Sequence, residues 1–177
     1  MIFSPALLEG AWTIQPTPVE DERGSFTRTF DAEAWRTQGL DPAVVQCSVS
    51  FNTRRGTLRG LHYQASPHGE AKVVRCTRGA IYDVIVDLRQ DSSSYCRWFA
   101  VELSESNGTM LYVPVGFAHG FQTLSDATEV SYQISRAYAA THGRGVRWDD
   151  AAFGIEWPHA DERVISERDR TYADYRP

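Results

Sequence analysis

The chain has 177 residues, of which 42% are hydrophobic and 23% are charged, and its formal net charge is −5. This length suits one globular domain with a sizeable core, so we expect a single domain over residues 1–177. The negative charge disfavours a nucleic-acid-binding protein, because such proteins neutralise several phosphates from a basic face.

Taken in chain order, the local patterns predict short strands and very little helix. Residues 31–36 begin with the capping residue Asp31 and predict one short helix. In the stretch 81–88, Asp83 and Asp87 alternate with apolar residues, which predicts a half-buried strand. Similar apolar segments follow turn residues at 73–76, 98–103, 110–113 and 129–134, and residues 166–169 predict one late helical turn. Short strands at regular spacing predict an all-β sandwich or barrel, and they favour a jelly roll with a few short peripheral helices.

Features of targeting, membrane insertion and disulfide bonding are missing from the sequence. The longest uncharged run, residues 106–125, is too polar and too interrupted by glycine and proline for a membrane span. The first residues lack the basic and apolar segments of a signal peptide, so we expect a cytoplasmic protein. Three cysteines, Cys47, Cys76 and Cys96, have no metal-binding or disulfide spacing, and we expect buried thiols.

Several common catalytic motifs are also missing. The sequence has no Gly-rich phosphate loop ending in Gly-Lys, no complete dinucleotide-binding fingerprint and no Gly-x-Ser-x-Gly nucleophile elbow. Folds that bind ATP or NAD are therefore disfavoured, and the chemistry has to come from other residues.

Two segments resemble the signatures of the cupin jelly rolls. The first runs from Gly56 through His62 and Gln64 to Gly79, and the second is residues 114–119. In metal-binding cupins the first signature supplies two histidines and a glutamate. In this chain His62 matches the first histidine, but Gln64 and Lys72 stand in the other two ligand positions. A metal ion at this position would have too few ligands and would be repelled by the ammonium of Lys72. We therefore predict a metal-free, electropositive cavity suited to an anionic substrate.

Four residues near these signatures are candidates for chemistry. Lys72 is the one lysine beside 17 arginines, and its spacing puts it in the cavity. His62 is the candidate base, because imidazole titrates near neutrality. Arg59 is flanked by apolar residues, which predicts a partly buried guanidinium able to bind phosphate or carboxylate. His119 fits a position in the cavity and a packed core histidine equally well.

Beyond the cupin signatures, the chain from about Phe3 to Asp174 closely resembles the dTDP-4-dehydrorhamnose 3,5-epimerase family. The matching segments are 21–24 with Phe26, 56–64, 72–75, 82–84 through 87–89, 114–121, Tyr132, 144–150, 155–158 and 165–169. Such an ordered series is far more specific than a shared barrel.

The resemblance implies epimerisation of a dTDP-4-keto-6-deoxyhexose at C3 and C5 without a cofactor. A base removes a proton beside the ketone to give an enolate, and reprotonation on the other face inverts the centre. By the resemblance His62 and Asp169 form the base dyad, Tyr132 returns the proton, and Lys72 stabilises the enolate oxygen.

The resemblance also implies the binding residues and the assembly. Family members are homodimers that exchange strands, so we expect a homodimer that binds a nucleotide sugar, with no nucleic-acid or membrane partner. Arg59 and Arg23 are expected at the diphosphate or nucleotide, and His119 at the sugar. The full set expected to bind substrate is Arg23, Phe26, Gln46, Asn52, Arg59, His119 and Arg168.

The chain departs from the common family pattern at four positions, namely Arg28, Ser48, Gln133 and Gly143. The sequence therefore leaves open the nucleotide, the sugar, and whether one centre or both are inverted. A single-site 3- or 5-epimerase is the nearest alternative. A metal-dependent cupin and a non-catalytic sugar-binding barrel are the alternatives from other classes.

Overall fold

A computed structural model describes residues 1–176. In chain order its elements are β1 (Ile2–Pro5), β2 (Trp12–Gln15), β3 (Val19–Asp21), β4 (Gly24–Phe26), α1 (Ala32–Thr37), β5 (Gln46–Asn52), β6 (Thr57–Gln64), β7 (Lys72–Arg78), β8 (Ala80–Asp87), β9 (Trp98–Ser104), β10 (Met110–Val113), β11 (Phe117–Thr123), β12 (Thr128–Ile134), β13 (Gly143–Gly145), β14 (Val164–Ile165) and α2 (Glu167–Arg170). The expected all-β fold with short peripheral helices is confirmed.

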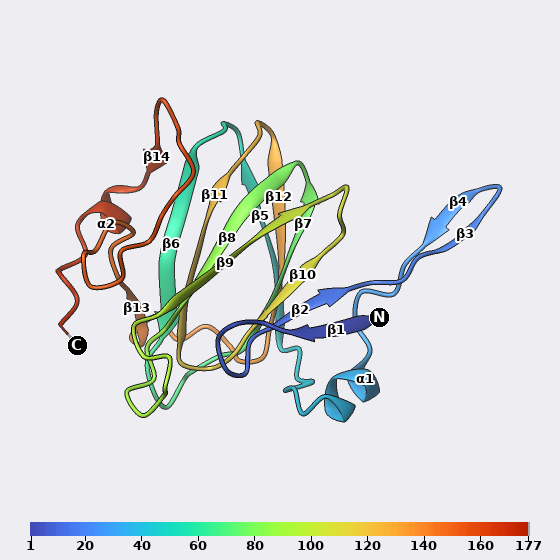
Figure 1. The fold of residues 1–177 in the computed structure, drawn as a ribbon, viewed down its shortest axis with the longest axis horizontal. Helices are drawn as coiled ribbons and strands as arrows, with labels where there is room; N and C mark the ends of the chain where they lie inside the picture. Colours follow the sequence, from blue (N-terminus) through green and yellow to red (C-terminus); the bar gives the residue numbers. More distant parts are fainter. Residues whose placement is uncertain (177) are drawn as a thin grey trace.

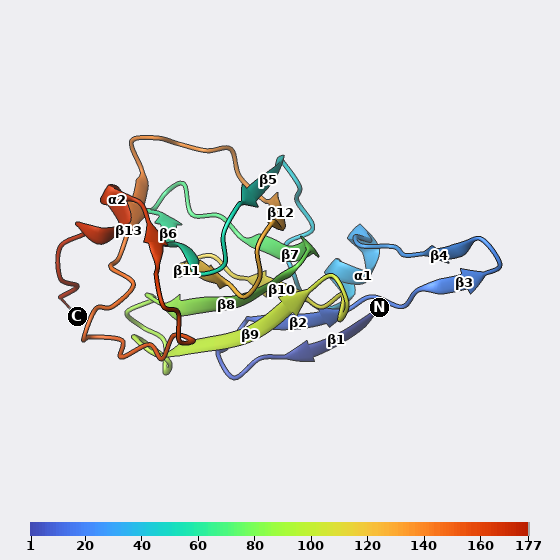
Figure 2. The ribbon, with the colours of Figure 1, turned by 90° about the horizontal axis from the view of Figure 1, so that it is seen from above.

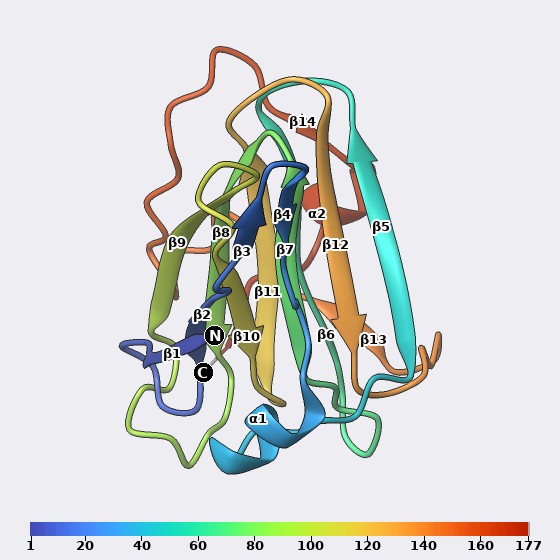
Figure 3. The ribbon, with the colours of Figure 1, turned by 90° about the vertical axis from the view of Figure 1, so that its right-hand side faces the viewer.

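Two antiparallel sheets pack face to face (Figure 1). The first has the strand order β1-β2-β10-β7-β12-β5, and the second has the order β13-β6-β11-β8-β9, with β14 added in parallel to β6. The main core fills the space between the sheets, with Val74 and Leu111 from the first and Ile85 and Phe121 from the second. Sequentially distant strands become neighbours in this way, as β5 and β12 do at one edge (Figure 3).

Each sheet is also covered on its outer side. Trp35 of α1 packs with Ile14 and Met110 on the outer side of the first sheet. Asp31 caps α1 by accepting the amide hydrogens of residues 33 and 34, which confirms the expected helix start. The C-terminal segment that follows β13 covers the second sheet (Figure 2). In this segment Phe153 packs with Val84 and Val86.

The half-buried prediction for residues 81–88 is wrong, because both faces of β8 are buried. Asp83, Ile85 and Asp87 share the face that packs between the sheets, and Val84 and Val86 lie under the C-terminal segment. Strand β8 is central in its sheet, and both Asp83 and Asp87 are fully buried. Their carboxylates have partners, since Asp87 accepts hydrogen bonds from Arg89 and Ser92 and Asp83 contacts His119. Period-2 alternation cannot reveal that a later segment covers the outer face.

The hairpin of β3 and β4 projects away from the two sheets (Figures 1 and 2). Its apolar residues Val19 and Phe26 are 70% and 74% exposed. The expectation that all cysteines are buried is wrong for Cys47, which is exposed on the edge strand β5. Across residues 1–176, none of the helices has the length and apolar character needed to cross a bilayer.

Candidate active site

A cavity of about 670 Å³ lies between the two sheets and is closed on one side by β14 and α2. Strands β5, β7 and β12 of the first sheet form one wall, and β6 and β11 of the second sheet form the other. Four basic side chains line it, namely Arg59, Lys72, Arg144 and Arg168, against the acidic Glu70 and Asp169. This balance agrees with the expected electropositive cavity.

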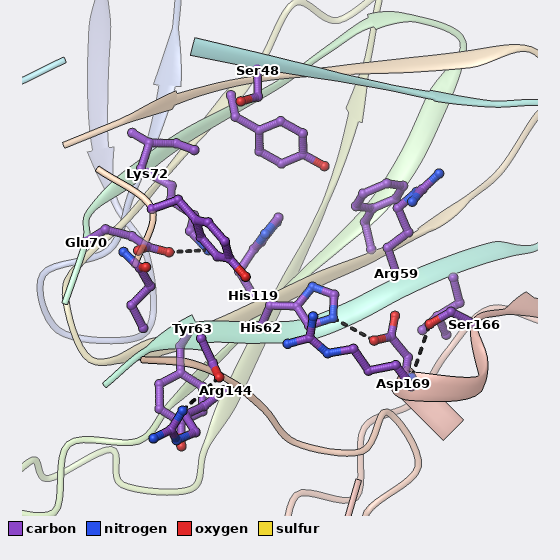
Figure 4. Close-up of a pocket in the computed structure, with 18 of the residues that line it drawn as sticks. Ser48, Arg59, His62, Tyr63, Glu70, Lys72, His119, Arg144, Ser166 and Asp169 are labelled. Atoms are coloured by element: carbon purple, nitrogen blue, oxygen red, sulfur yellow. Dashed lines mark hydrogen bonds and ion pairs between the residues drawn. The ribbon is translucent and has the colours of Figure 1, made fainter. Parts of the chain in front are cut away.

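His62 and Asp169 form a close pair on the β6 side of the cavity (Figure 4). The imidazole Nε2 lies 2.7 Å from Oδ1 of Asp169, and the second carboxylate oxygen accepts the Gly60 amide hydrogen at 3.2 Å. Only 6% of the Asp169 side chain is exposed, against 40% of the His62 side chain. The acid is therefore held behind the imidazole, which remains accessible from the cavity.

Local features of α2 and of β6 fix the positions of Asp169 and His62. Ser166 caps α2 by accepting the amide hydrogen of Asp169, so the helix start positions the carboxylate. Strands β6 and β11 approach so closely at Gly60 that a Cβ added there would lie 2.5 Å from the Cα of Gly120. Gly60, which has a φ of +127°, thereby directs its amide toward Asp169.

The hydrogen bonds to Asp169 keep its carboxylate ionised. Burial raises the pKa of Asp169, but the hydrogen bond and charge of His62, with the Gly60 amide, outweigh burial and hold the pKa below its usual value. In the tautomer that carries its proton on Nε2, His62 donates this proton to the Asp169 carboxylate and leaves the Nδ1 lone pair free.

Tyr132 lies on the opposite wall, on β12 of the first sheet. Its hydroxyl is 3.4 Å from the Ser50 hydroxyl. Burial raises the pKa of Tyr132 well above its usual value, and the hydrogen bond of Ser50 only partly offsets this. The phenol is therefore protonated at neutral pH and can donate.

A second histidine–carboxylate pair lies deeper. His119 Nε2 is 2.7 Å from Oδ1 of Asp83, and both side chains are almost fully buried. His119 nevertheless lines the cavity, so it is at once a packed residue and a cavity residue. Burial raises the pKa of Asp83, although the charges of His119 and Lys72 oppose the rise.

Lys72 opens β7 and lines the cavity as expected, but it is not a free cation. Its Nζ lies 2.9 Å from Oε1 of Glu70, and only 13% and 8% of the two side chains are exposed. Gln64, in the other altered ligand position, uses its amide nitrogen to bind the carbonyls of residues 68 and 137. Across residues 1–176, no group of three or more His, Cys, Asp or Glu side chains is arranged to hold a metal ion.

The remaining expected binding residues divide into two groups. Arg59 and Arg168 line the cavity, while Asn52 accepts the Arg59 Nε–H at 2.7 Å and thus orients it. Arg59 is exposed rather than partly buried as predicted, because its side of β6 faces the open cavity. Gln46 at the start of β5 accepts the backbone amide hydrogen of Tyr138, a cavity residue.

Arg23 and Phe26 lie on the projecting hairpin and do not line the cavity of their own chain. The Arg23 guanidinium pairs with Asp21 on the same hairpin, and 83% of its side chain is exposed. Within one protomer these two residues are therefore separate from the other expected site residues.

Comparison with known proteins identifies the family. The family model described as dTDP-4-dehydrorhamnose 3,5-epimerase matches residues 5–176. The chain belongs to this family. It is 44% identical over 169 residues to the dTDP-4-dehydrorhamnose 3,5-epimerase of Sinorhizobium fredii, a match that covers 96% of this chain and 87% of the relative.

Solved structures of the epimerase family share the fold. The Bacillus anthracis dTDP-4-dehydrorhamnose 3,5-epimerase, solved with TDP and PPi bound, has a TM-score of 0.94 and 38% identity, with 98% of this chain and 99% of that chain covered. A 3′-monoepimerase from Streptomyces bikiniensis, solved with dTDP-quinovose, has a TM-score of 0.87 and 37% identity, with 93% and 83% covered. The expected family and the cupin-type jelly roll are thus confirmed.

The residues that depart from the epimerase pattern lie in different surroundings. Ser48 and Gly143 line the cavity. Arg28 is outside it and pairs with Asp31 at the start of α1. Gln133 is on β12, and its buried Oε1 has no hydrogen-bond partner among the described residues.

Four further residues of the site were not predicted from the sequence, namely Glu70, Asp83, Arg144 and Ser166. Glu70 had a usable signal, because it lies two residues before Lys72 and alternate residues share a face in extended chain. Asp83 sits among apolar residues of a strand, which is a weak sign of a buried, partnered acid.

Proposed function

We propose that the protein epimerises a dTDP-4-keto-6-deoxyhexose at C3 and C5, converting dTDP-4-dehydro-6-deoxyglucose into dTDP-4-dehydrorhamnose. The observation that carries this proposal is the His62–Asp169 pair on one wall of a cavity with Tyr132 on the other. Family membership supports it as well. A base and an acid on opposite sides of a sugar ring are what inversion of a carbon acid requires.

In this mechanism His62 removes the proton at C3 or C5 through Nδ1. Asp169 accepts the Nε2–H bond and stabilises the imidazolium that forms. The electron pair of the broken C–H bond moves into an enolate whose negative oxygen is the former 4-keto oxygen. Tyr132 then donates its proton to the same carbon from the opposite face. To complete the cycle, the His62 imidazolium releases its proton to solvent and the Tyr132 phenolate takes one up from solvent.

Lys72 stabilises the enolate oxygen electrostatically. Only 13% of the Lys72 side chain is exposed, and an electrostatic interaction of such a shielded ammonium is stronger than one in water. His119, with Asp83 behind it, lies near Tyr132, at a ring distance of 6.2 Å, and would contact the sugar.

The basic residues around the cavity mouth suit the diphosphate. Arg59 is oriented by Asn52, and the Arg168 guanidinium lies over the Tyr172 ring at 5.9 Å. Guanidinium groups bind phosphate oxygens through paired hydrogen bonds. Gln46 helps to hold Tyr138 at the rim, where a base or sugar could stack.

A homodimer would complete the site. The projecting hairpin carries Arg23 and Phe26 into solvent, and the edge strand β5 exposes Val49 and Phe51 at 61% and 52%. Exposed apolar residues on an edge strand and on a separate hairpin favour pairing with a second copy. Arg23 and Phe26 would then contact the nucleotide in the partner's cavity. Sedimentation analysis should give a dimer, and a stable monomer would contradict this part of the proposal.

The test of the reaction is solvent-deuterium exchange. Wild-type protein incubated with dTDP-4-dehydro-6-deoxyglucose in D₂O should incorporate deuterium at C3 and at C5. His62→Ala should abolish this incorporation while the protein stays folded, and His159→Ala, which alters an exposed imidazole, should have no effect. Exchange at neither carbon in the wild type would exclude the proposed reaction.

Inversion of a single centre is the second candidate, favoured by the similarity to a 3′-monoepimerase and by Ser48 and Gly143 in the cavity lining. Exchange at one carbon only would decide for it.

Metal independence stays a prediction that metal analysis of the purified protein can test, and the cytoplasmic location and the absence of a cofactor also stay predictions.

A further inference from the structure

Glu70 is a buried carboxylate in the cavity to which the proposed reaction assigns no task. It lies in the connection between β6 and β7, and its side chain is 8% exposed. Figure 4 shows it paired with Lys72 beside the cavity. A buried acid costs free energy unless it has a partner, so its position next to the reactive ammonium needs an explanation.

The segment around Glu70 is held on both sides. Before it, the carbonyl of His68 accepts a hydrogen bond from the Gln64 side chain at 3.1 Å. After it, the Ala71 amide donates to the Ser135 hydroxyl at 2.8 Å, and the Ser135 amide donates to the Ala71 carbonyl at 3.0 Å. These contacts anchor the backbone on either side, so Glu70 presents its carboxylate from a fixed position.

The geometry allows the Lys72 ammonium to bind Glu70 and a ligand at the same time. Lys72 has a long, flexible stem and three N–H donors. The contact with Glu70 holds Nζ at 2.9 Å from one carboxylate oxygen and leaves donors for a ligand in the cavity. The charge of Lys72 also acts on the carboxylate of Asp83, lowering its pKa, but Asp83 already pairs with His119.

We propose that Glu70 is a positioning residue that fixes the Lys72 ammonium at the place where the enolate oxygen forms. The inference rests on the proposed function, since Lys72 acts on the substrate only if the cavity is the epimerase site. Glu70 acts through Lys72 and does not contact the reacting atoms. A displacement of about 1 Å in such a group can cost about 10²-fold in rate.

The test is a double-mutant cycle with Glu70→Gln and Lys72→Ala. Glu70→Gln should lower kcat about 10- to 100-fold and leave KM and the affinity for dTDP within about twofold, because the contact acts on the transition state. In the Lys72→Ala background, Glu70→Gln should not lower kcat any further. Deuterium incorporation is followed over many hours, so that the low rates of the proteins carrying Lys72→Ala can be measured.

Controls separate positioning from folding. Glu102→Gln makes the same chemical change on the exposed side of β9 and should leave kcat unchanged. Melting curves check that Glu70→Gln folds. If it does not, Glu70→Asp, which keeps the carboxylate, is measured in the same cycle and is expected to lose rate only when Lys72 is present.

Three outcomes would overturn the inference: an unchanged kcat in Glu70→Gln, a loss confined to KM, or an equal loss with and without Lys72. If the wild-type protein exchanges deuterium, any of these three outcomes rejects the role of Glu70 but leaves the proposed function intact. Absence of exchange in the wild type itself rejects the proposed function instead.

Discussion

The replacement Asp169→Asn tests the base dyad most directly. The carboxylate holds the Nε2 proton of His62 at 2.7 Å and also accepts the Gly60 amide hydrogen. An asparagine can keep its carbonyl oxygen on the Gly60 amide, and its NH₂ group then faces Nε2. That arrangement favours the tautomer with the proton on Nδ1, so the nitrogen facing the substrate can no longer act as a base.

The size of the effect follows from the contact. A hydrogen bond to a charged group contributes about 1.5–3 kcal/mol, and the 6% exposure of the Asp169 side chain puts this bond at the upper end. Loss of about 3 kcal/mol corresponds to about 10²-fold in rate. The unfavourable tautomer adds to this, and general-base catalysis contributes about 10²- to 10⁴-fold in all. We therefore expect kcat to fall by about 10²- to 10⁴-fold.

The assay is the rate of deuterium incorporation from D₂O, measured with saturating nucleotide sugar. KM should change little, because Asp169 lies behind His62. Asp161→Asn is the matched control, since Asp161 contacts His159 at 3.3 Å on the exposed surface. A folded Asp169→Asn protein with kcat within about threefold of wild type would refute the dyad.

Other replacements test the remaining parts of the site and the core. Lys72→Arg keeps the charge but replaces a compact ammonium by a planar guanidinium, so we expect kcat to fall at least about tenfold, and near-normal turnover would contradict this. Tyr132→Phe removes the proton donor but not the base, so deuterium incorporation should persist while the epimerised product falls by about 10²-fold in an NMR assay; product at the wild-type rate would exclude Tyr132 as the donor. In the core, although burial raises the pKa of Asp87, hydrogen bonds from Arg89, Ser92 and Ser94 lower it overall from 3.8 to about 2, which corresponds to about 2 kcal/mol of stability. Because the folded pKa is depressed, this contribution is present above about pH 4 and is lost as the pH falls toward 2. Asp87→Asn should thus lower the free energy of unfolding at pH 7 but much less at pH 2, and equal losses at both would disprove the assignment.

Local patterns were sufficient for much of the fold. Apolar alternation located β8, β9, β10 and β12 closely, because the side-chain period of a strand is visible in any short window. Asp31 and Ser166 mark the starts of both helices, because capping side chains bond to the next few amides. The same patterns could not show that β8 is buried on both faces, at Ile85 by the first sheet and at Val84 and Val86 by the C-terminal segment, since these contacts join distant residues.

The candidate site was only partly accessible from sequence. Spacing within the cupin signatures led to His62 and Lys72, and the family resemblance led to Asp169 and Tyr132. The Glu70 partner of Lys72 was missed, because Glu70 lies outside the ligand positions of the cupin signatures. Arg23 and Phe26 were grouped with the site by resemblance, yet within one chain they lie on a hairpin outside the cavity.

By itself the sequence determined the strand pattern, the helix caps and the residue types available for proton transfer, because each depends on a few neighbouring positions. The tertiary structure alone decided which groups meet. His62 and Asp169 are 107 positions apart and touch because α2 packs beside β6, while Tyr132 faces them because its strand belongs to the other sheet. Long-range pairing of strands sets these contacts, and no local pattern encodes it.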